Sequence, residues 1–232
     1  MDIYQATRPV IVVGLTVMVF SVLCLVGCRK APIDRSLLTD APCAAPCWQG
    51  ITPGVTSRSQ AMAVLQESPY IRQDTLREAG TEEWGGVTWE WRAPGRRLQS
   101  SISWQNGIVQ EITLGLTYDL TVGEIVNKYG PPEALGAASG GVPEHWYWIV
   151  DLYYPQRGLQ FKAYTRKYST LFEPTTEVGG ALLFVPMSLE ERVTVEFGDP
   201  AIVSRVISKI RPWQGYGDLF EIYYESPQDL EQ

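Results

Sequence analysis

Histidine is almost absent from the sequence, which contains His145 alone among 232 residues. One histidine leaves little room for a nucleophile triad built on histidine or for a histidine-rich metal site. The G-x-S-x-G, S-x-x-K, H-E-x-x-H and P-loop patterns are also missing. His145 precedes Trp146 and is more typical of a strand-end residue with a local hydrogen bond. We therefore predict no catalytic residue, no metal site and no cofactor.

Positive charge is scarce as well, since 19 Lys and Arg stand against 26 Asp and Glu, for a formal net charge of −7. Proteins that bind nucleic acid need clustered cations. The pairs Arg96-Arg97 and Arg166-Lys167 are short and typical of solvated loops or strand ends. The paired carboxylates Glu82-Glu83 and Glu190-Glu191 are adjacent in sequence, so they point apart and make no acid/base pair. Nucleic acid is not an expected partner.

Charge is absent altogether from Val10 to Gly27, a run dominated by aliphatic residues, Met and Phe. A weakly basic flank with Arg8 precedes the run, which is the layout of a secretory signal. The run ends in Leu25-Val26-Gly27-Cys28. An aliphatic residue lies three positions before Cys28 and a small residue lies directly before it. This ending resembles the lipobox of bacterial lipoproteins.

The resemblance implies that Cys28 receives diacylglycerol, that residues 1–27 are removed, and that the new amino terminus is acylated. Several acyl chains anchor stably, because each buried CH₂ contributes roughly 0.8 kcal/mol and one chain alone is marginal. Cys24 is a poorer lipid site because the bulky Leu23 precedes it. The alternative is an uncleaved transmembrane helix, since a span needs about 20 apolar residues. Both interpretations place a membrane at the amino terminus, and the lipoprotein places the remaining chain outside the cytoplasm.

Residues 28–50 are rich in Pro, Ala and small polar groups and lack a hydrophobic period, which predicts a semi-flexible linker. Cys43 and Cys47 form a C-x3-C pair in this segment. A disulfide is the usual state of such a pair in an oxidising compartment. A zinc site would need four ligands, and His145 is distant in sequence. We predict the disulfide Cys43–Cys47.

Three helix starts share a capping box, a hydroxyl residue followed three positions later by Gln or Glu, whose side chains satisfy free backbone N–H groups. The pairs are Ser57/Gln60, Thr121/Glu124 and Ser188/Glu191. The second and third helices also end alike, in Tyr129-Gly130-x-Pro132 and Phe197-Gly198-x-Pro200. Glycine can take a left-handed position after a helix, and proline blocks its continuation.

These spacings predict one helix–sheet module at 51–118, a second at 119–187 and a shorter third at 188–232. The expected fold class is α+β, with short helices packed on antiparallel β-sheet and the module repeated two to three times. Antiparallel strands should follow each helix. In the first module Val87, Trp89 and Trp91 alternate with polar residues, the period of a half-buried strand.

A hairpin is predicted around Asn106-Gly107, with two possible turns. A two-residue turn pairs Trp104 with Val109 and Ile102 with Glu111. A three-residue loop from Gln105 to Gly107 pairs Trp104 with Ile108 and gathers the apolar side chains on one face. We favour the three-residue loop, with Gly107 left-handed.

In the second module a flexible loop is expected at 136–141. The strand 146–154 is apolar on both faces, which favours a position inside the sheet. A turn at 155–158 and a further strand at 181–186 follow. In the third module, 201–210 and 218–225 are expected to be strands.

A capped helix, a Gly-x-Pro ending and antiparallel strands in tandem resemble the SmpA/OmlA-type outer-membrane-assembly lipoproteins and the β-lactamase-inhibitor-like modules. The resemblance covers residues 51–225 and implies a helical pair on one face of a curved sheet. The first copy departs from the pattern, with Ser68-Pro69 in place of the Gly-x-Pro ending. Residues 46–54, PCWQGITPG, also resemble a segment of uncharacterised bacterial lipoproteins, which supports an envelope location and implies no activity.

The chain has eight Trp and twelve Tyr, and most tryptophans alternate along strands, which favours core packing. Exposed aromatics would suit the hot spot of a protein interface or a platform for sugar. Trp beside Gln99, Gln105, Asn106 or Asp151 would favour sugar, whereas an apolar patch ringed by Arg96, Arg97 and Glu111 would favour protein. We predict a non-enzymatic, extracytoplasmic lipoprotein that interacts with or scaffolds an envelope protein. The alternative is binding of a cell-envelope glycan or small ligand, and the oligomeric state is open.

Overall fold

The computed structural model describes residues 32–92, 99–140, 142 and 146–223. Residues 33–223 belong to one compact unit. The segment 1–27, Cys28, Arg96-Arg97, His145 and the tail after Tyr223 lie outside the described residues, so the lipobox remains a prediction. No helix in the described ranges is both long and apolar enough to cross a membrane.

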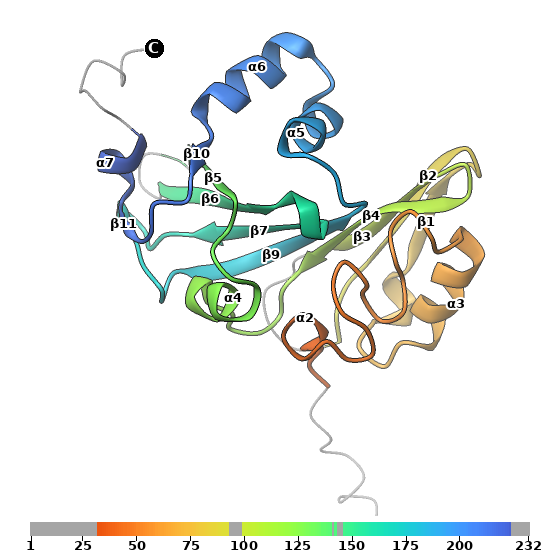
Figure 1. Ribbon diagram of the computed structural model, residues 1–232. Coiled ribbons are helices and arrows are strands. Elements are labelled where there is room, and N and C mark those ends of the chain that lie inside the picture. Colours follow the sequence, from red (N-terminus) through yellow and green to blue (C-terminus); the bar gives the residue numbers. More distant parts are fainter. Residues whose placement is uncertain (1–31, 93–98, 141, 143–145, 224–232) are drawn as a thin grey trace, which may run out of the picture. The chain divides into compact units, whose positions relative to one another are not determined.

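A nine-stranded antiparallel sheet forms the frame of this unit (Figure 1), in the order β1-β2-β3-β4-β9-β7-β6-β5-β10. Its strands are β1 (Arg77–Gly80), β2 (Trp84–Trp89), β3 (Ser100–Gln105), β4 (Ile108–Gly115), β5 (Ala134–Gly140), β6 (Tyr147–Tyr154), β7 (Leu159–Tyr164), β9 (Glu177–Phe184) and β10 (Arg211–Pro212). A separate two-stranded sheet pairs β8 (Leu171–Phe172) with β11 (Gly217–Asp218). The α+β fold class is confirmed.

Short helices accompany the sheet. They are α2 (Ser36–Thr39), α3 (Arg58–Glu67), α4 (Val122–Tyr129), α5 (Leu189–Phe197), α6 (Pro200–Lys209) and α7 (Leu219–Tyr223), with 3-10 turns η1 (Gln73–Thr75) and η3 (Pro155–Arg157). The three predicted capping boxes are all present, at the starts of α3, α4 and α5. Gly130 and Gly198 follow α4 and α5 with positive φ angles of 81° and 69°, as their place after a helix requires.

Strands from residues 51–118 and from 119–187 lie in one sheet. The central pairing joins β4 to β9, with Glu111 opposite Phe184 and Leu114 opposite Ala181. On one side of this seam β1 to β4 follow α3, and on the other β5, β6, β7 and β9 follow α4. Each half therefore places its last strand at the seam and its first strand farthest from it, and β10 lies beyond β5 at the edge of the sheet.

The strands expected at 201–210 and 218–225 are a wrong prediction, because these segments contain α6 and α7. The side chain of Asp199 accepts a hydrogen bond from the backbone N–H of Ala201 at 2.8 Å, and Pro200 occupies the first helical turn. Proline is favoured there because its missing N–H has no helical partner to lose. Pro200 therefore both ends α5 and starts α6.

The three-residue loop between β3 and β4 is also a wrong prediction. Gln105 pairs with Ile108, so Asn106 and Gly107 form a two-residue turn. Their φ angles are 50° and 70°, as a type I′ turn needs. A register shift between Ser103 and Trp104 then returns Ile102 to a position opposite Ile112. This β-bulge keeps the apolar side chains on one face, which was the reason for preferring the longer loop.

Residues 134–140 form β5, so the flexible loop expected at 136–141 is a third wrong prediction. Small residues are needed there to accommodate the large side chains of β6. A Cβ on Gly136 would lie 3.2 Å from the ring of Tyr153, and one on Gly140 would lie 3.0 Å from Cδ1 of Ile149. The inner position of β6 and the turn at 155–158 are confirmed.

The main core lies between one face of the sheet and α2, α3 and α4. Leu37, Leu65 and Ile125 from these helices join one buried cluster with Ile112 and Phe161 from the sheet. Helix α5 covers part of the opposite face, where Arg192 lies over the ring of Phe184 at 4.5 Å. Figure 1 shows α5 and α6 on the far side of the sheet from α2 and α4.

Residues 33–50 are packed on the body, which corrects the prediction that 28–50 are all linker. Trp48 is 1% exposed and stacks on Trp89 at 5.6 Å. Its indole N–H donates to Oδ2 of Asp34 at 2.6 Å. The hydroxyl of Tyr129 donates to the carbonyl of Leu37. The Pro- and Ala-rich composition gives no sign of these apolar and hydrogen-bonded contacts, because they depend on partners distant in sequence. The predicted Cys43–Cys47 disulfide is confirmed.

Candidate functional site

Among the strands of the nine-stranded sheet that follow one another along the chain and also pair with each other, β7 and β9 have the longest connection. It takes twelve residues, 165–176, whereas β3 and β4 are joined by two residues and β6 and β7 by four. Adjacent antiparallel strands need only a short turn. Connections of about this length that carry little regular structure are commonly functional. The 165–176 connection is therefore a candidate for a functional site.

Aromatic contacts hold the connection against the carboxyl-terminal part of the chain. Phe172 is fully buried and contacts the rings of Trp213 and Tyr216, with centroids 6.2 and 5.9 Å away. The hydroxyl of Thr170 donates to Oδ2 of Asp218 at 2.8 Å. The connection is thus fixed at its middle.

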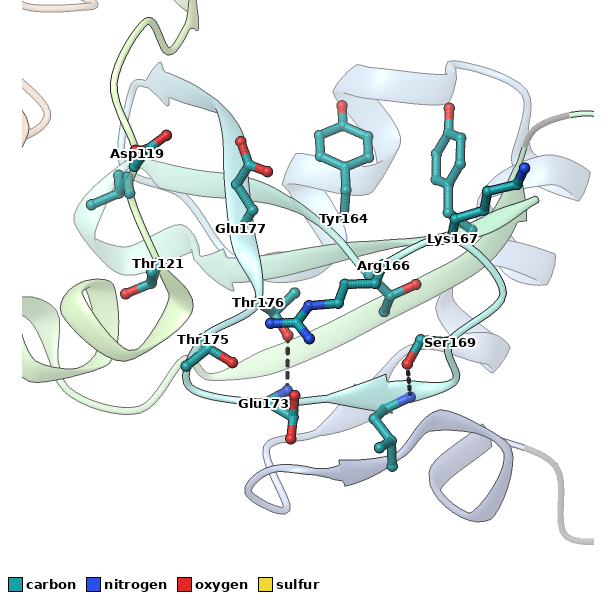
Figure 2. Close-up of a pocket in the computed structure, with 14 residues that line it drawn as sticks. Asp119, Thr121, Tyr164, Arg166, Lys167, Ser169, Glu173, Thr175, Thr176 and Glu177 are labelled. Carbon is teal, nitrogen blue, oxygen red and sulfur yellow. Dashed lines mark hydrogen bonds between the residues drawn. The ribbon is translucent and has the colours of Figure 1, made fainter. Parts of the chain in front are cut away.

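Its final residues cap the start of α4. The carbonyl of Thr176 accepts the N–H of Val122 at 2.9 Å, and that of Pro174 accepts the N–H of Gly123 at 2.8 Å. A Cβ on Gly123 would lie 3.0 Å from the carbonyl oxygen of Pro174, so glycine permits this close approach. The backbone N–H of Glu173 donates to the hydroxyl of Thr176 at 2.8 Å (Figure 2).

These contacts shape a cleft of about 590 Å³, drawn in Figure 2. The sheet contributes Tyr147, Tyr164 and Glu177. The connection contributes Thr165, Arg166, Lys167, Ser169, Leu171 and the residues from Glu173 to Thr176 except Pro174, and the segment before α4 contributes Asp119, Leu120 and Thr121. The volume is within the range of about 300–1,000 Å³ found for small-ligand sites.

Two tyrosines form the aromatic wall of the cleft. Tyr147 and Tyr164 meet edge to face, with ring centroids 5.8 Å apart. Tyr164 lies over Gly179, where a Cβ would come within 2.7 Å of its ring. Gly179 is the additional residue at the register shift between β7 and β9, where Lys162 pairs with Gly180 and Ala163 with Val178. Bulges commonly re-aim side chains beside functional sites, and this one gives the Tyr164 ring its room.

Charges of both signs line the cleft. In Figure 2, Asp119 and Lys167 lie at opposite ends, with Glu177 on the side of Asp119. Arg166 extends over the turn that contains Thr176. Within the described ranges Arg166 makes no ion pair. Lys167 places Nζ 4.7 Å from the ring centre of Tyr168. The cleft can therefore receive opposite charges at its two ends.

The hydroxyls of the cleft are arranged for binding or for structure. Ser169 uses Oγ to accept the N–H of Leu171 at 3.1 Å, and Thr121 uses Oγ1 in the capping box of α4. The Thr121 hydroxyl donates to Oε2 of Glu124 at 2.9 Å, and the same carboxylate oxygen accepts the backbone N–H of Thr121, so this contact belongs to the capping box. The part of the chain that the structure describes contains no group of three or more His, Cys, Asp and Glu that could hold a metal ion.

A second polar cluster lies under α5 on the same side of the sheet. Arg192 is 2% exposed, and it donates to Oε2 of Glu111 at 2.7 Å and to Oε1 of Gln160 at 3.1 Å. Asp151 accepts hydrogen bonds from Gln160 and from Lys162 at 3.0 and 2.9 Å. Burial lowers the pKa of Lys162, but the charge and the hydrogen bond of Asp151 together with the charge of Glu196 outweigh it, so the net shift is upward. This cluster fastens α5 to the sheet.

The tryptophans are mostly core residues, as predicted. Trp48, Trp89, Trp104 and Trp148 are at most 2% exposed, and Trp84 is 61% exposed. Trp84 lies directly opposite Gln105, one of the residues whose proximity to Trp would favour sugar. Asp151 and Glu111, also considered in this context, are engaged by Lys162 and Arg192.

Sequence patterns alone did not identify the cleft. Arg166 and Lys167 were predicted to be at a solvated loop or strand end. They do lie just after β7 and are exposed, but they also line the cleft. The sequence signal for the cleft is the number of residues between Tyr164 and the next long apolar strand, which is larger than a hairpin turn needs.

Comparison with known proteins gives no match to a family model, a curated protein or a solved structure.

Proposed function

We propose that the protein is a non-enzymatic binding protein, anchored by lipid at Cys28 on the extracytoplasmic face of a membrane, and that it interacts with an envelope protein through the cleft. The cleft between Tyr164, Arg166 and Asp119 is the observation that carries this proposal. It combines an aromatic wall with both signs of charge. Aromatic and charged side chains in a concave site are typical of recognition.

Two features support the envelope location. The Leu25-Val26-Gly27-Cys28 ending resembles a lipobox. The Cys43–Cys47 disulfide is of a kind that persists in oxidising compartments and is rare in the cytosol.

The finer architecture is also a proposal, namely that residues 51–118 and 119–187 are two copies of one module. In its support, each range begins with a capping-box helix and supplies four strands to the nine-stranded sheet, the last of which lies at the seam. The third copy lacks this support, because 188–232 contributes α5, α6 and α7 and only the two-residue strands β10 and β11.

A cross-linking experiment in the native host tests the function. The full chain with a carboxyl-terminal tag is cross-linked briefly, and co-purified proteins are identified by mass spectrometry. Thr175→Trp fills the cleft from its exposed wall, and Ser204→Trp on exposed α6 is the matched control. The proposal expects a recurrent envelope partner that Thr175→Trp loses and Ser204→Trp keeps. Equal recovery in both variants, or no recurrent partner at all, would contradict it.

The same sample tests the anchor. A lipid-modified amino-terminal peptide beginning at Cys28 is expected. An intact Met1 would contradict the lipoprotein and favour an uncleaved membrane segment.

A glycan is the second candidate ligand, favoured by the Tyr147–Tyr164 wall beside the hydroxyls of Thr165 and Thr175. Aromatic rings next to hydroxyl groups suit sugar rings. Titration with soluble cell-wall fragments distinguishes the candidates. Saturable binding that Tyr164→Ala abolishes would favour the glycan, and the absence of binding across the panel would exclude it.

A further inference from the structure

We infer that the cleft binds a short free peptide by charge at two points, with the amino group of the peptide beside Asp119 and its carboxylate beside Arg166. This inference shares with the proposed function the cleft as binding site and goes beyond that function, because a peptide with both ends free is a small ligand and not an envelope protein.

Separation of charge within the cleft supports an oriented ligand. In Figure 2, Asp119 and Glu177 lie toward one end and Lys167 extends toward the other, while the guanidinium of Arg166 lies between them over the turn that holds Thr176. The carboxylate of Glu173, which also lines the cleft, points away from the tyrosines in the same view. A ligand bound in the reverse direction would place like charges together, which costs affinity. One orientation is therefore favoured.

Arg166 is the key cation. Its guanidinium has no ion pair among the described residues, and it extends over the fixed turn that holds Thr176. A guanidinium offers paired N–H donors that match the two oxygens of a carboxylate. Among the described residues, no ion pair of Arg166 has to break before a carboxylate binds there.

The space between the charged ends suits a side chain with apolar surface. Tyr147 and Tyr164 form one wall, and the exposed Leu171 adds apolar surface. A volume of about 590 Å³ fits a ligand of small-molecule size, which for a peptide means a few residues. An uncharged sugar would leave Arg166 and Asp119 without charged partners, so charge complementarity favours the peptide.

Calorimetric titration of the full-length protein in detergent tests the inference. The probes are alanyl-tyrosyl-alanine and its forms that are amino-acetylated, carboxyl-amidated or blocked at both ends. Each blocked end should weaken binding about tenfold, since a charge-assisted contact contributes on the order of one factor of ten. Raised salt should reduce the preference for the free peptide, because exposed charges are screened.

Two variants assign the ends. Arg166→Gln should remove the preference for a free carboxylate over the amide and keep the preference for a free amine. Asp119→Asn should do the opposite. Arg205→Gln and Glu133→Gln, which change exposed charges outside the cleft, should leave all four affinities unchanged.

Equal binding of the free and doubly blocked peptides would overturn the inference. So would variants that weaken all four probes by the same factor. The outcome is separable from the proposed function, because loss of the cross-linked partner in Thr175→Trp can occur without charge selectivity. Conversely, charge-selective peptide binding with no envelope partner would support this inference and contradict the proposed function.

Discussion

Replacement of Arg192 by methionine should destabilise the protein strongly. The side chain is 2% exposed and joins α5 to the sheet through Glu111 and Gln160, at 2.7 and 3.1 Å. Its Nη2 atom also lies 3.5 Å from Oε2 of Glu196. Methionine can keep the apolar contact with Phe184 but leaves the carboxylates without their cation.

The expected loss in the free energy of unfolding is about 3 kcal/mol. Removing one partner of a buried ion pair costs about 3–5 kcal/mol. The side chains of Glu111 and Glu196 are 29% and 25% exposed, so water relieves part of the unpaired charge and the lower end applies. A domain has only about 5–15 kcal/mol of stability in total, so the effect is easily measured.

Guanidinium denaturation followed by tryptophan fluorescence measures this loss, with the disulfide kept intact. Glu111→Gln should cost less, about 1 kcal/mol, because its neutral amide oxygen can still accept from Arg192. Arg205→Met on exposed α6 is the matched control and should change stability by no more than about 0.5 kcal/mol. If Arg192→Met and Arg205→Met lower the free energy of unfolding by the same amount, the cluster under α5 does not fasten the helix.

Three further predictions concern other parts of the fold. Burial raises the pKa of Tyr129 from its ordinary value of 10.0 to about 12, so its contribution to stability is fully present below pH 10 and is lost as the pH rises through the folded-state pKa. Tyrosinate absorbance and denaturation at graded pH should show this, and Tyr129→Phe should reduce the slope. Trp48→Ala should cost about 3–5 kcal/mol in chemical denaturation, because a large buried side chain is lost, whereas Asp34→Ala should cost about 1–2 kcal/mol. Gly107→Ala should cost about 1–3 kcal/mol, since the φ angle of Gly107 is +70° and a residue with a Cβ is strained there, and Asn106→Gly should be near neutral in the same assay.

Each of these predictions has a contradicting result. A slope in alkaline stability that is unchanged in Tyr129→Phe would show that this hydroxyl is already solvated. Trp48→Ala with wild-type stability would show that residues 33–50 do not pack on the body. A neutral Gly107→Ala would contradict the two-residue turn between β3 and β4.

Features fixed by local chemistry were predictable from sequence. Each capping box depends on two side chains within four residues, and all three form. Apolar residues on both faces of 146–154 predicted an inner strand, and β6 has that position. The Cys43–Cys47 pair is close enough in sequence for its partner to be evident.

Features that depend on distant partners were not predictable. The same Gly-x-Pro signal is followed by β5 after α4 and by α6 after α5, because only Asp199 supplies a side-chain cap for a new helix. The glycines of β5 are typical of a loop in the sequence, and the reason for them in a strand is the large side chains of the neighbouring strand β6. The cleft combines 119–121, 147 and 164–177, and only the pairing of β6, β7 and β9 brings these segments together.

Site-specific photocross-linking tests the central claim most directly. A photoreactive phenylalanine is placed at Thr175 in the cleft or at Ser204 on exposed α6, and the full chain is irradiated in the native host. The account predicts one recurrent envelope protein joined to position 175 and absent from position 204. No adduct at 175, or the same adducts at both positions, would contradict binding through the cleft.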